Sequence, residues 1–172
     1  MTPWPLEIDA GGGVALRAAD PIDAEAITDA VHESLDELQP WMPWAADPIS
    51  IDQQAVRLAV LAEAMALGGD AGYTVVADGD LAGYLGVHDR LGDPTAREIG
   101  YWLRTSAAGR GTMTGAVLAM AGVLADRGFT RAEIHCHEHN LRSAAVAARC
   151  GFTYTSTTDA SMTWVRLLRP PP

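Results

Sequence analysis

The stretch that decides the fold is EIGYWLRTSAAGRGTMTGAVLAMAGVLADRG, residues 98–128. It reads as a strand, a turn in which Arg110 separates Gly109 from Gly111, and a long apolar helix. The first N–H groups of a helix have no backbone partner and lie at the positive end of its dipole, so such a corner binds anions. Glycines there remove the Cβ atoms that would keep a phosphate away. The alternative that stays open is a tight turn whose glycines adopt positive φ.

Residues around this turn fit a phosphate site but not the two commonest phosphate motifs. Thr112 and Thr114 add hydroxyl donors beside the positive charge of Arg110. A P-loop needs a lysine after its second glycine, and the sequence contains none. A dinucleotide fingerprint needs GxGxxG, whereas Gly115 follows one residue too late.

Composition narrows the possible partners. The chain has 172 residues and a formal net charge of −10, which disfavours nucleic acid and favours a cationic partner such as an amine. No apolar run is long enough to span a bilayer, and the first residues do not resemble a secretory signal. We therefore expect a single domain over residues 1–172, in the cytoplasm, with residues 168–172 as a frayed proline-rich tail.

Periodicity along the chain predicts a mixed α/β domain. Strands are expected at 14–20, on both sides of the Asp78-Gly79 turn, at 97–105 and at 131–139, with a final antiparallel pair from 151 onwards. Helices are expected at 21–38, 51–67, 109–127 and 140–150. The order places one parallel strand–helix–strand crossover in a mostly antiparallel sheet, with helices on both faces.

Three segments together resemble a known family. They are EIGYWL followed by GRGTMTGAV, then HEHNLRSAAVAARCGF, and the tryptophan-rich LQPWMPWA at 38–45. Their sequence and order resemble the Gcn5-related N-acetyltransferases (GNAT), and most of all the RimJ/RimL-like branch, which acetylates the N-termini of ribosomal proteins. The resemblance covers nearly the whole chain and implies the GNAT fold, acetyl-CoA as cofactor and, by analogy, a homodimer.

The resemblance also assigns cofactor-binding residues. The pyrophosphate would bind backbone N–H groups over residues 109–114, and the pantetheine arm would pair with the strand near its end. The positions implied are Trp102, Leu103, Arg104, Gly109, Arg110, Gly111, Thr112, Met113, Thr114 and Asn140. Ser106 stands where the family motif usually has glutamine or arginine.

Catalytic groups are implied in the same way. The family often places a glutamate base on this strand, which is Glu98 here, with Glu133 and Glu138 as rivals on the next strand. The alternative for Glu98 is a solvated residue at a strand edge. The family's frequent tyrosine acid would fall at Ala147, whereas Ser143 matches the serine proposed as acid in the RimL-like branch.

The acceptor is predicted from acid–base chemistry. An α-amine, with a pKa of about 7.7–8.0, is neutral roughly once in six at pH 7, and a lysine only about once in 2,500. This favours a protein or peptide N-terminus, and Trp41, Trp44 and Tyr101 are assigned to its pocket, although the tryptophans could simply be packing residues. Alternatives are a small amine or aminoglycoside-like antibiotic, or a non-catalytic acyl-CoA-binding module.

The histidines of HCHEH, residues 135–139, are not expected to hold a metal. Same-face strand residues stand about 7 Å apart, whereas zinc needs converging tetrahedral ligands.

Overall fold

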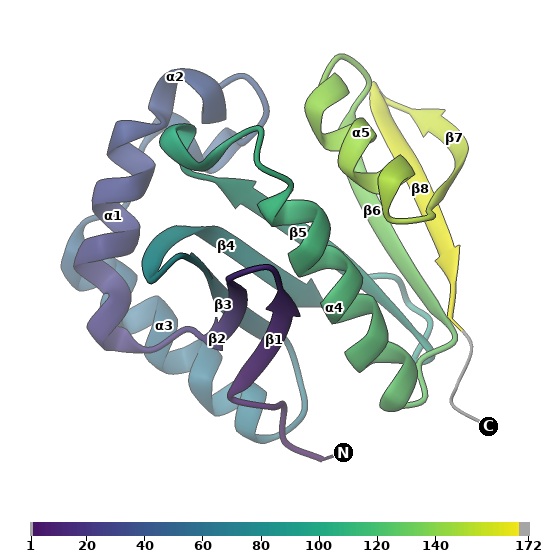
Figure 1. Ribbon diagram of the computed structural model, residues 1–172, viewed down its shortest axis with the longest axis horizontal. Helices are drawn as coiled ribbons and strands as arrows, with labels where there is room; N and C mark the ends of the chain where they lie inside the picture. Colours follow the sequence, from purple (N-terminus) through teal and green to yellow (C-terminus); the bar gives the residue numbers. More distant parts are fainter. Residues whose placement is uncertain (1, 169–172) are drawn as a thin grey trace.

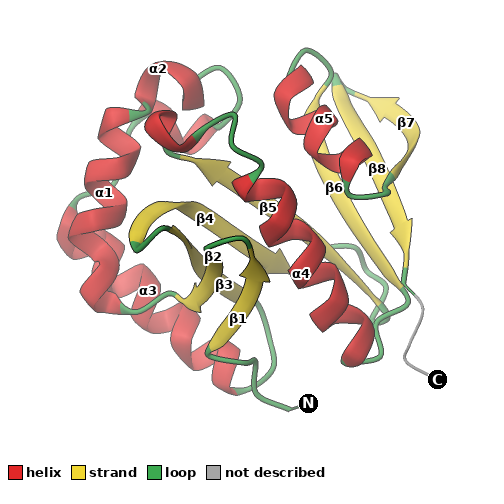
Figure 2. Cartoon of the chain, in the orientation of Figure 1, coloured by secondary structure: helices red, strands yellow, loops and turns green. Residues whose placement is uncertain are grey.

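A computed structural model describes residues 2–168, and its centre is one eight-stranded sheet (Figures 1 and 2). The spatial order is β1-β2-β3-β4-β5-β6-β8-β7, and all neighbours are antiparallel except β5 and β6. The predicted fold class is confirmed. The strands are β1 (Glu7–Gly11), β2 (Val14–Ala18), β3 (Ala71–Ala77), β4 (Asp80–His88), β5 (Ala96–Leu103), β6 (Arg131–His137), β7 (Thr153–Thr158) and β8 (Ser161–Leu167).

Helices cover both faces of the sheet. The α-helices are α1 (Ala24–Glu33), α2 (Leu35–Leu38), α3 (Ile51–Ala66), α4 (Thr112–Asp126) and α5 (Leu141–Arg149), and short 3-10 turns η1 (Pro21–Asp23), η2 (Pro43–Ala46) and η3 (Thr105–Ala107) join them. One core lies between the sheet and α4, and a second lies between the sheet and α1 and α3. None of the helices in residues 2–168 is long and apolar enough to cross a membrane.

Three expectations about the elements were wrong in detail. β1 was missed because EIDAGGG is acidic and glycine-rich, and its residues are at most half-buried. The helix expected over 21–38 is broken at Ser34, whose buried hydroxyl accepts a hydrogen bond from the Thr105 N–H at 3.0 Å. Of the tail expected at 168–172, Leu168 is buried and its N–H donates to the Thr130 carbonyl, while residues 169–172 lie outside the described part.

Candidate active site at the β5–β6 seam

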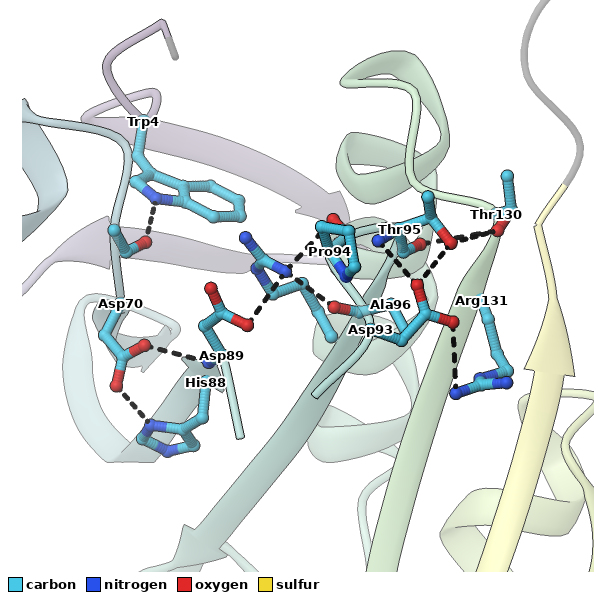
Figure 3. Close-up of polar contacts among 12 residues, drawn as sticks. Trp4, Asp70, His88, Asp89, Asp93, Pro94, Thr95, Ala96, Thr130 and Arg131 are labelled. Carbon is cyan, nitrogen blue, oxygen red and sulfur yellow. Dashed lines mark hydrogen bonds and ion pairs between the residues drawn. The ribbon is translucent and has the colours of Figure 1, made fainter. Parts of the chain in front are cut away.

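We call the line between β5 and β6 the seam, and it is joined at one end only. The parallel pairing is confined to Ala96–Glu98 with Arg131–Glu133, beyond which the two strands diverge (Figure 1). At this closed end, Arg131 forms an ion pair with Asp93 at 3.4 Å, and the hydroxyl of Thr130 bonds that of Thr95 at 3.1 Å (Figure 3). The open end therefore leaves one edge of β5 unpaired.

The unpaired edge presents backbone groups to the gap. The Arg104 N–H donates to the Ala82 carbonyl of β4 at 2.8 Å. Alternate residues of a strand direct their N–H and C=O to opposite edges, so Ile99, Tyr101 and Leu103 face the gap. Of the three β5-end residues predicted to pair with the cofactor arm, Leu103 thus offers its backbone there, whereas Trp102 and Arg104 face β4.

On the face towards α1 and α3, three cross-strand pairs line up along β4 and β5. Tyr84 lies opposite Trp102, Gly86 opposite Gly100, and His88 opposite Glu98. The glycine pair has no side chains, so it forms a hollow between an aromatic pair and a titratable pair. Neighbouring side chains of β5 take opposite faces: Trp102 packs towards α1 and α3, and Tyr101 towards α4 and α5.

A cavity of about 790 Å³ opens over this hollow and crosses the seam. Its walls come from α1, the α2–α3 connection, α3, β4, β5, β6, the start of α5 and the β7–β8 turn. It brings together the predicted catalytic and acceptor residues with two of the predicted cofactor residues, which are Glu98, Ser143, Trp41, Trp44, Tyr101, Trp102 and Asn140. The rivals Glu133 and Glu138 do not line it.

Ser143 and Tyr101 bridge the open end of the seam. The Tyr101 hydroxyl lies 3.0 Å from the Ser143 Oγ and 3.1 Å from its carbonyl oxygen. Burial raises the pKa of the Tyr101 phenol, with the Ser143 hydrogen bond opposing it, and burial also raises the pKa of the nearby Cys136 thiol. The Tyr101 phenol and the Cys136 thiol therefore both stay protonated. The hydrogen-bonded hydroxyls of Tyr101 and Ser143 form a path along which a proton can move within the cavity. Ala147 is fully buried, so the family's tyrosine position faces the core here.

Asn140 positions Ser143. Its Oδ1 accepts the Ser143 N–H at 3.1 Å as the N-cap of α5. The predicted cofactor contact of Asn140 would thus have to come from its Nδ2 group.

Glu98 is mostly buried within the sheet, which overturns the alternative of a solvated edge residue. Its carboxylate lies 3.8 Å from the Arg90 Nε, and its side chain is 18% exposed. The carboxylate therefore already has a cationic neighbour at the cavity wall.

The tryptophans frame the mouth of the cavity. The Trp41 ring lies 5.5 Å from that of His137, and the Trp44 ring 6.4 Å from that of Trp102. Trp44 is 46% exposed. Such exposure is unusual for a packing residue and leaves an aromatic face available to an acceptor.

The glycine turn adopts the geometry that both interpretations required. Gly109 and Gly111 each have φ of 82°, and nothing lies within 4 Å of a Cβ built on either. Gly111 is the N-cap of α4 and makes no side-chain capping bond. Within residues 2–168, the N–H groups of residues 111–114 make no backbone bond outside the helix and none to a side chain. They are available donors at the positive end of a 15-residue helix.

Several side chains near the turn already contact other parts of the protein. The Thr114 Oγ1 accepts from the Arg149 Nε at 3.3 Å, and Met113 is buried in the core, so it offers only its backbone. The Arg104 guanidinium pairs with Glu33, an interaction that lowers the pKa of the Glu33 carboxyl. Arg110 is exposed beside these amides. None of the residues of this turn lines the large cavity.

Together these features fit a coenzyme A thioester. The free amides of α4 and Arg110 suit a pyrophosphate, and the unpaired edge of β5 suits an extended arm that carries amide groups. No group of three or more His, Cys, Asp or Glu in residues 2–168 could hold a metal ion. His135 instead contacts Glu133 at 3.1 Å.

Sequence reasoning missed several polar residues of the cavity region, and three of them matter most here. His88 and Gln54 line the cavity, and Asp70 contacts His88. Gln54 sits on the buried side of α3, a pattern the sequence shows only as a polar residue at an apolar position. His88 closes a predicted strand, and only its pairing with Glu98 reveals its neighbourhood.

A crossover that is open at one end, with free helix amides beside it, is an arrangement that suits an acyl-CoA-dependent transferase. The chain belongs to the acetyltransferase (GNAT) domain family, whose model matches residues 14–153, and it is an N-acetyltransferase with acetyl-CoA as its cofactor.

Individual relatives agree with the predicted branch. A Bacillus subtilis protein provisionally named ribosomal N-acetyltransferase YdaF is 27% identical over 145 residues, 81% of this chain and 77% of that protein. The structure of RimL, a ribosomal L7/L12 alpha-N-protein acetyltransferase with coenzyme A, matches with a TM-score of 0.85 and 25% identity over 94% of this chain and 98% of that one. A Salmonella typhimurium acetyltransferase that modifies the N-terminal serine of L7/L12 matches with a TM-score of 0.82 and 25% identity. The match covers 94% of this chain and 99% of that one.

Proposed function

We propose that this protein acetylates the N-terminal α-amine of a protein or peptide. The observation that carries the proposal is the single cavity that joins the open seam to the hollow over Gly86 and Gly100. An amine could approach through this cavity over the glycine hollow, while a thioester lay along the unpaired edge of β5, which supports the proposal. The similarity to RimL over 94% of the chain supports an α-amine as the acceptor.

The chain's own residues supply three functions in the reaction. Acetyl-CoA brings the acetyl group as a thioester. N–H groups on the open edge of β5 would hold and polarise a carbonyl. The Ser143–Tyr101 pair would carry a proton to a leaving thiolate, and a base at the His88–Glu98 end of the hollow would take one from the amine.

An unsatisfied donor in the cavity wall favours a peptide over a polyamine. Gln54 is 5% exposed, and its Nε2 is buried without a hydrogen-bond partner among the described residues. Its Oε1 accepts from the Arg57 Nε at 3.3 Å. Because a guanidinium can only donate, this contact fixes which end of the amide is oxygen. The remaining Nε2 suits a carbonyl or carboxylate oxygen, which every peptide offers and polyamines lack.

The experiment is a transfer assay against matched amines. Thiol release and product mass would be measured with acetyl-CoA and peptides carrying a free N-terminus, the same peptides with a blocked N-terminus and an internal lysine, a polyamine and an aminoglycoside. Turnover restricted to free N-termini supports the proposal. Turnover restricted to the polyamine or aminoglycoside replaces it with small-amine acetylation, and coenzyme A binding without any turnover indicates a binding module.

We also propose that residues 1–172 form one domain that works in the cytoplasm as a homodimer. The family resemblance supports the dimer, and the net charge of −10 suits a freely dissolved protein. Light scattering at several concentrations tests the dimer, limited proteolysis the single domain, and cell fractionation the location. A strictly monomeric species would contradict the dimer.

A further inference from the structure

Asp70 and His88 form a polar pair at the edge of the cavity. The His88 Nδ1 lies 3.2 Å from the Asp70 Oδ2 (Figure 3). The other carboxylate oxygen, Oδ1, accepts the Asp89 N–H at 2.9 Å. Asp70 immediately precedes β3 and His88 ends β4, so the pair joins neighbouring strands. Two contacts on one carboxylate fix its orientation and, through it, the plane of the imidazole.

The glycine pair gives the imidazole its room. Gly86 precedes His88 by two residues and therefore lies on the same face of β4. A Cβ at Gly86 would lie 2.6 Å from the His88 Nε2, and one at Gly100 would lie 3.8 Å from it. The ring thus extends over the hollow, with Nε2 directed along the cavity floor. Any larger residue at position 86 would displace it.

The partner of Nδ1 decides the tautomer. A carboxylate only accepts, so the neutral ring carries its proton on Nδ1 and keeps a lone pair on Nε2. Nε2 has no hydrogen-bond partner in residues 2–168. A base oriented by a third group is the arrangement by which hydrolases hold a catalytic histidine.

The charged neighbours distinguish His88 from Glu98. Around the ring lie Asp70 and Asp89, Glu98 directly opposite on β5, Arg90 beyond Glu98, and Arg57 on α3 across the Tyr84 ring. The Glu98 carboxylate already has Arg90 at 3.8 Å. The His88 Nε2, in contrast, is an uncommitted lone pair over the floor of the cavity.

We propose that His88 is the general base of acetyl transfer and that Asp70 is its positioning residue. This inference rests on the proposed function, since it needs an amine acceptor. The lone pair of the neutral amine forms the C–N bond while one nitrogen proton moves to the His88 Nε2. The C–S bond breaks, the sulfur keeps its electron pair, and a proton relayed from solvent through Ser143 completes the thiol. His88 then returns its proton to solvent, so the charges balance.

The test combines a pH profile of the rate with NMR of the imidazole nitrogens. In the wild-type protein, log kcat/KM should fall with a slope of two at acid pH, because the amine and the imidazole must both be neutral for transfer. His88→Gln should lower kcat/KM by about 100-fold and reduce that slope to one. The exposed His32→Gln should behave as the wild type.

Two measurements other than activity distinguish a catalytic role of His88 from a purely structural one. By calorimetry, His88→Gln and Asp70→Asn should bind coenzyme A as the wild type does. By NMR of the ring nitrogens, the neutral His88 ring should carry its proton on Nδ1 in the wild type, and Asp70→Asn should weaken that preference.

Other outcomes overturn the inference. If His88→Gln stays within 2-fold of the wild type, His88 is not the base; if it keeps the slope of two while Glu98→Gln loses it, Glu98 is the base. If the acceptor is a small amine, the same variants are assayed with that amine: the proposed peptide function then fails while the result for His88 still decides the base. Absence of transfer to every amine overturns both.

Discussion

The two sides of the seam differ in how they are held. The body, β1 to β5 with α1 to α4, has helices on both faces and contains most of the buried core. The arm, β6, β8 and β7 with α5, is thinner, and every residue of β7 is exposed (Figures 1 and 2). Three residue pairs join their strands at the closed end. The backbone pairing that holds the two strands together is therefore confined to the closed end, where Arg131 also pairs with Asp93.

The open end is spanned by side chains rather than by backbone. The Tyr101–Ser143 hydrogen bonds and the Trp41–His137 ring contact cross it. Side-chain contacts of this size contribute about 1 kcal/mol each, so they set the width of the gap without sealing it. The four predictions below test this difference between the closed end, joined by backbone pairing, and the open end, bridged by side chains. They run from the largest expected effect to the smallest.

The stability of the protein should be most sensitive to substitution at the closed end of the seam. Arg97 is 2% exposed, its guanidinium lies 4.3 Å from the centre of the Phe129 ring, and it donates to the Ala96 carbonyl at 2.7 Å. Arg97→Ala leaves a void and unpaired polar groups, so the free energy of unfolding should fall by about 2–4 kcal/mol. Urea denaturation measures it. Arg97→Met, which restores the volume of the side chain but not its hydrogen-bond donors, is the control. A loss below about 0.5 kcal/mol in Arg97→Ala would show that Arg97 does not hold the closed end together.

Alkaline pH should loosen the contact between arm and body. Burial raises the pKa of the Cys150 thiol to about 11, and this thiol lies 3.5 Å from the Thr114 carbonyl oxygen of α4. An unfolded cysteine loses its proton near pH 8.5. The unfolded state therefore binds fewer protons above that pH, and stability should fall between about pH 8.5 and 11, by on the order of 2 kcal/mol.

The measurement is denaturant unfolding at pH 8, 9.5 and 11. Cys150→Ala should flatten the decline, although the buried tyrosines Tyr73 and Tyr101, whose pKa values burial also raises, will keep part of it. An unchanged slope in Cys150→Ala would contradict the assignment.

Removing the bridge should affect chemistry more than folding. Ser143→Ala deletes the hydroxyl that contacts Tyr101 and should lower kcat/KM by about 10-fold or more, with coenzyme A affinity retained. Steady-state kinetics with calorimetry separates the two. Tyr101→Phe is the matched variant, because it breaks the same bridge from the other side. Equal rates in Ser143→Ala and the wild type would remove Ser143 from the proton path.

The smallest effect should come from the glycine turn. Gly111→Ala places a Cβ at φ of 82° and should cost about 1 kcal/mol of stability while weakening coenzyme A binding. Gly122→Ala, on the exposed side of the same helix, should instead stabilise by about 0.5–1 kcal/mol and leave binding alone. Thermal unfolding and calorimetry measure both. Unchanged affinity in Gly111→Ala would argue against phosphate binding at this corner.

Local signals in the sequence determined much of the fold. The Asp78-Gly79 hairpin, with φ of 54° and 92°, and the end of α4 at Gly128, with φ of 85°, follow from residues that favour left-handed conformations. The order of elements around the crossover followed from residues 98–128, and the resemblance to the family rested on these together with residues 137–152 and 38–45. β1 and the break at Ser34 did not, because their causes are a neighbouring strand and a distant N–H group.

The candidate site divides in the same way. The glycine turn was predicted from the residues themselves, whereas Glu98 and Ser143 were implied by the resemblance to the family, because each matches a position in one of its motifs. The resemblance implied that the two strands splay apart, but the glycine floor and the Asp70–His88 pair appeared only in the tertiary structure. Strand register decides which residues stand opposite one another, and register depends on hydrogen bonds between segments far apart in the chain, which no local pattern records.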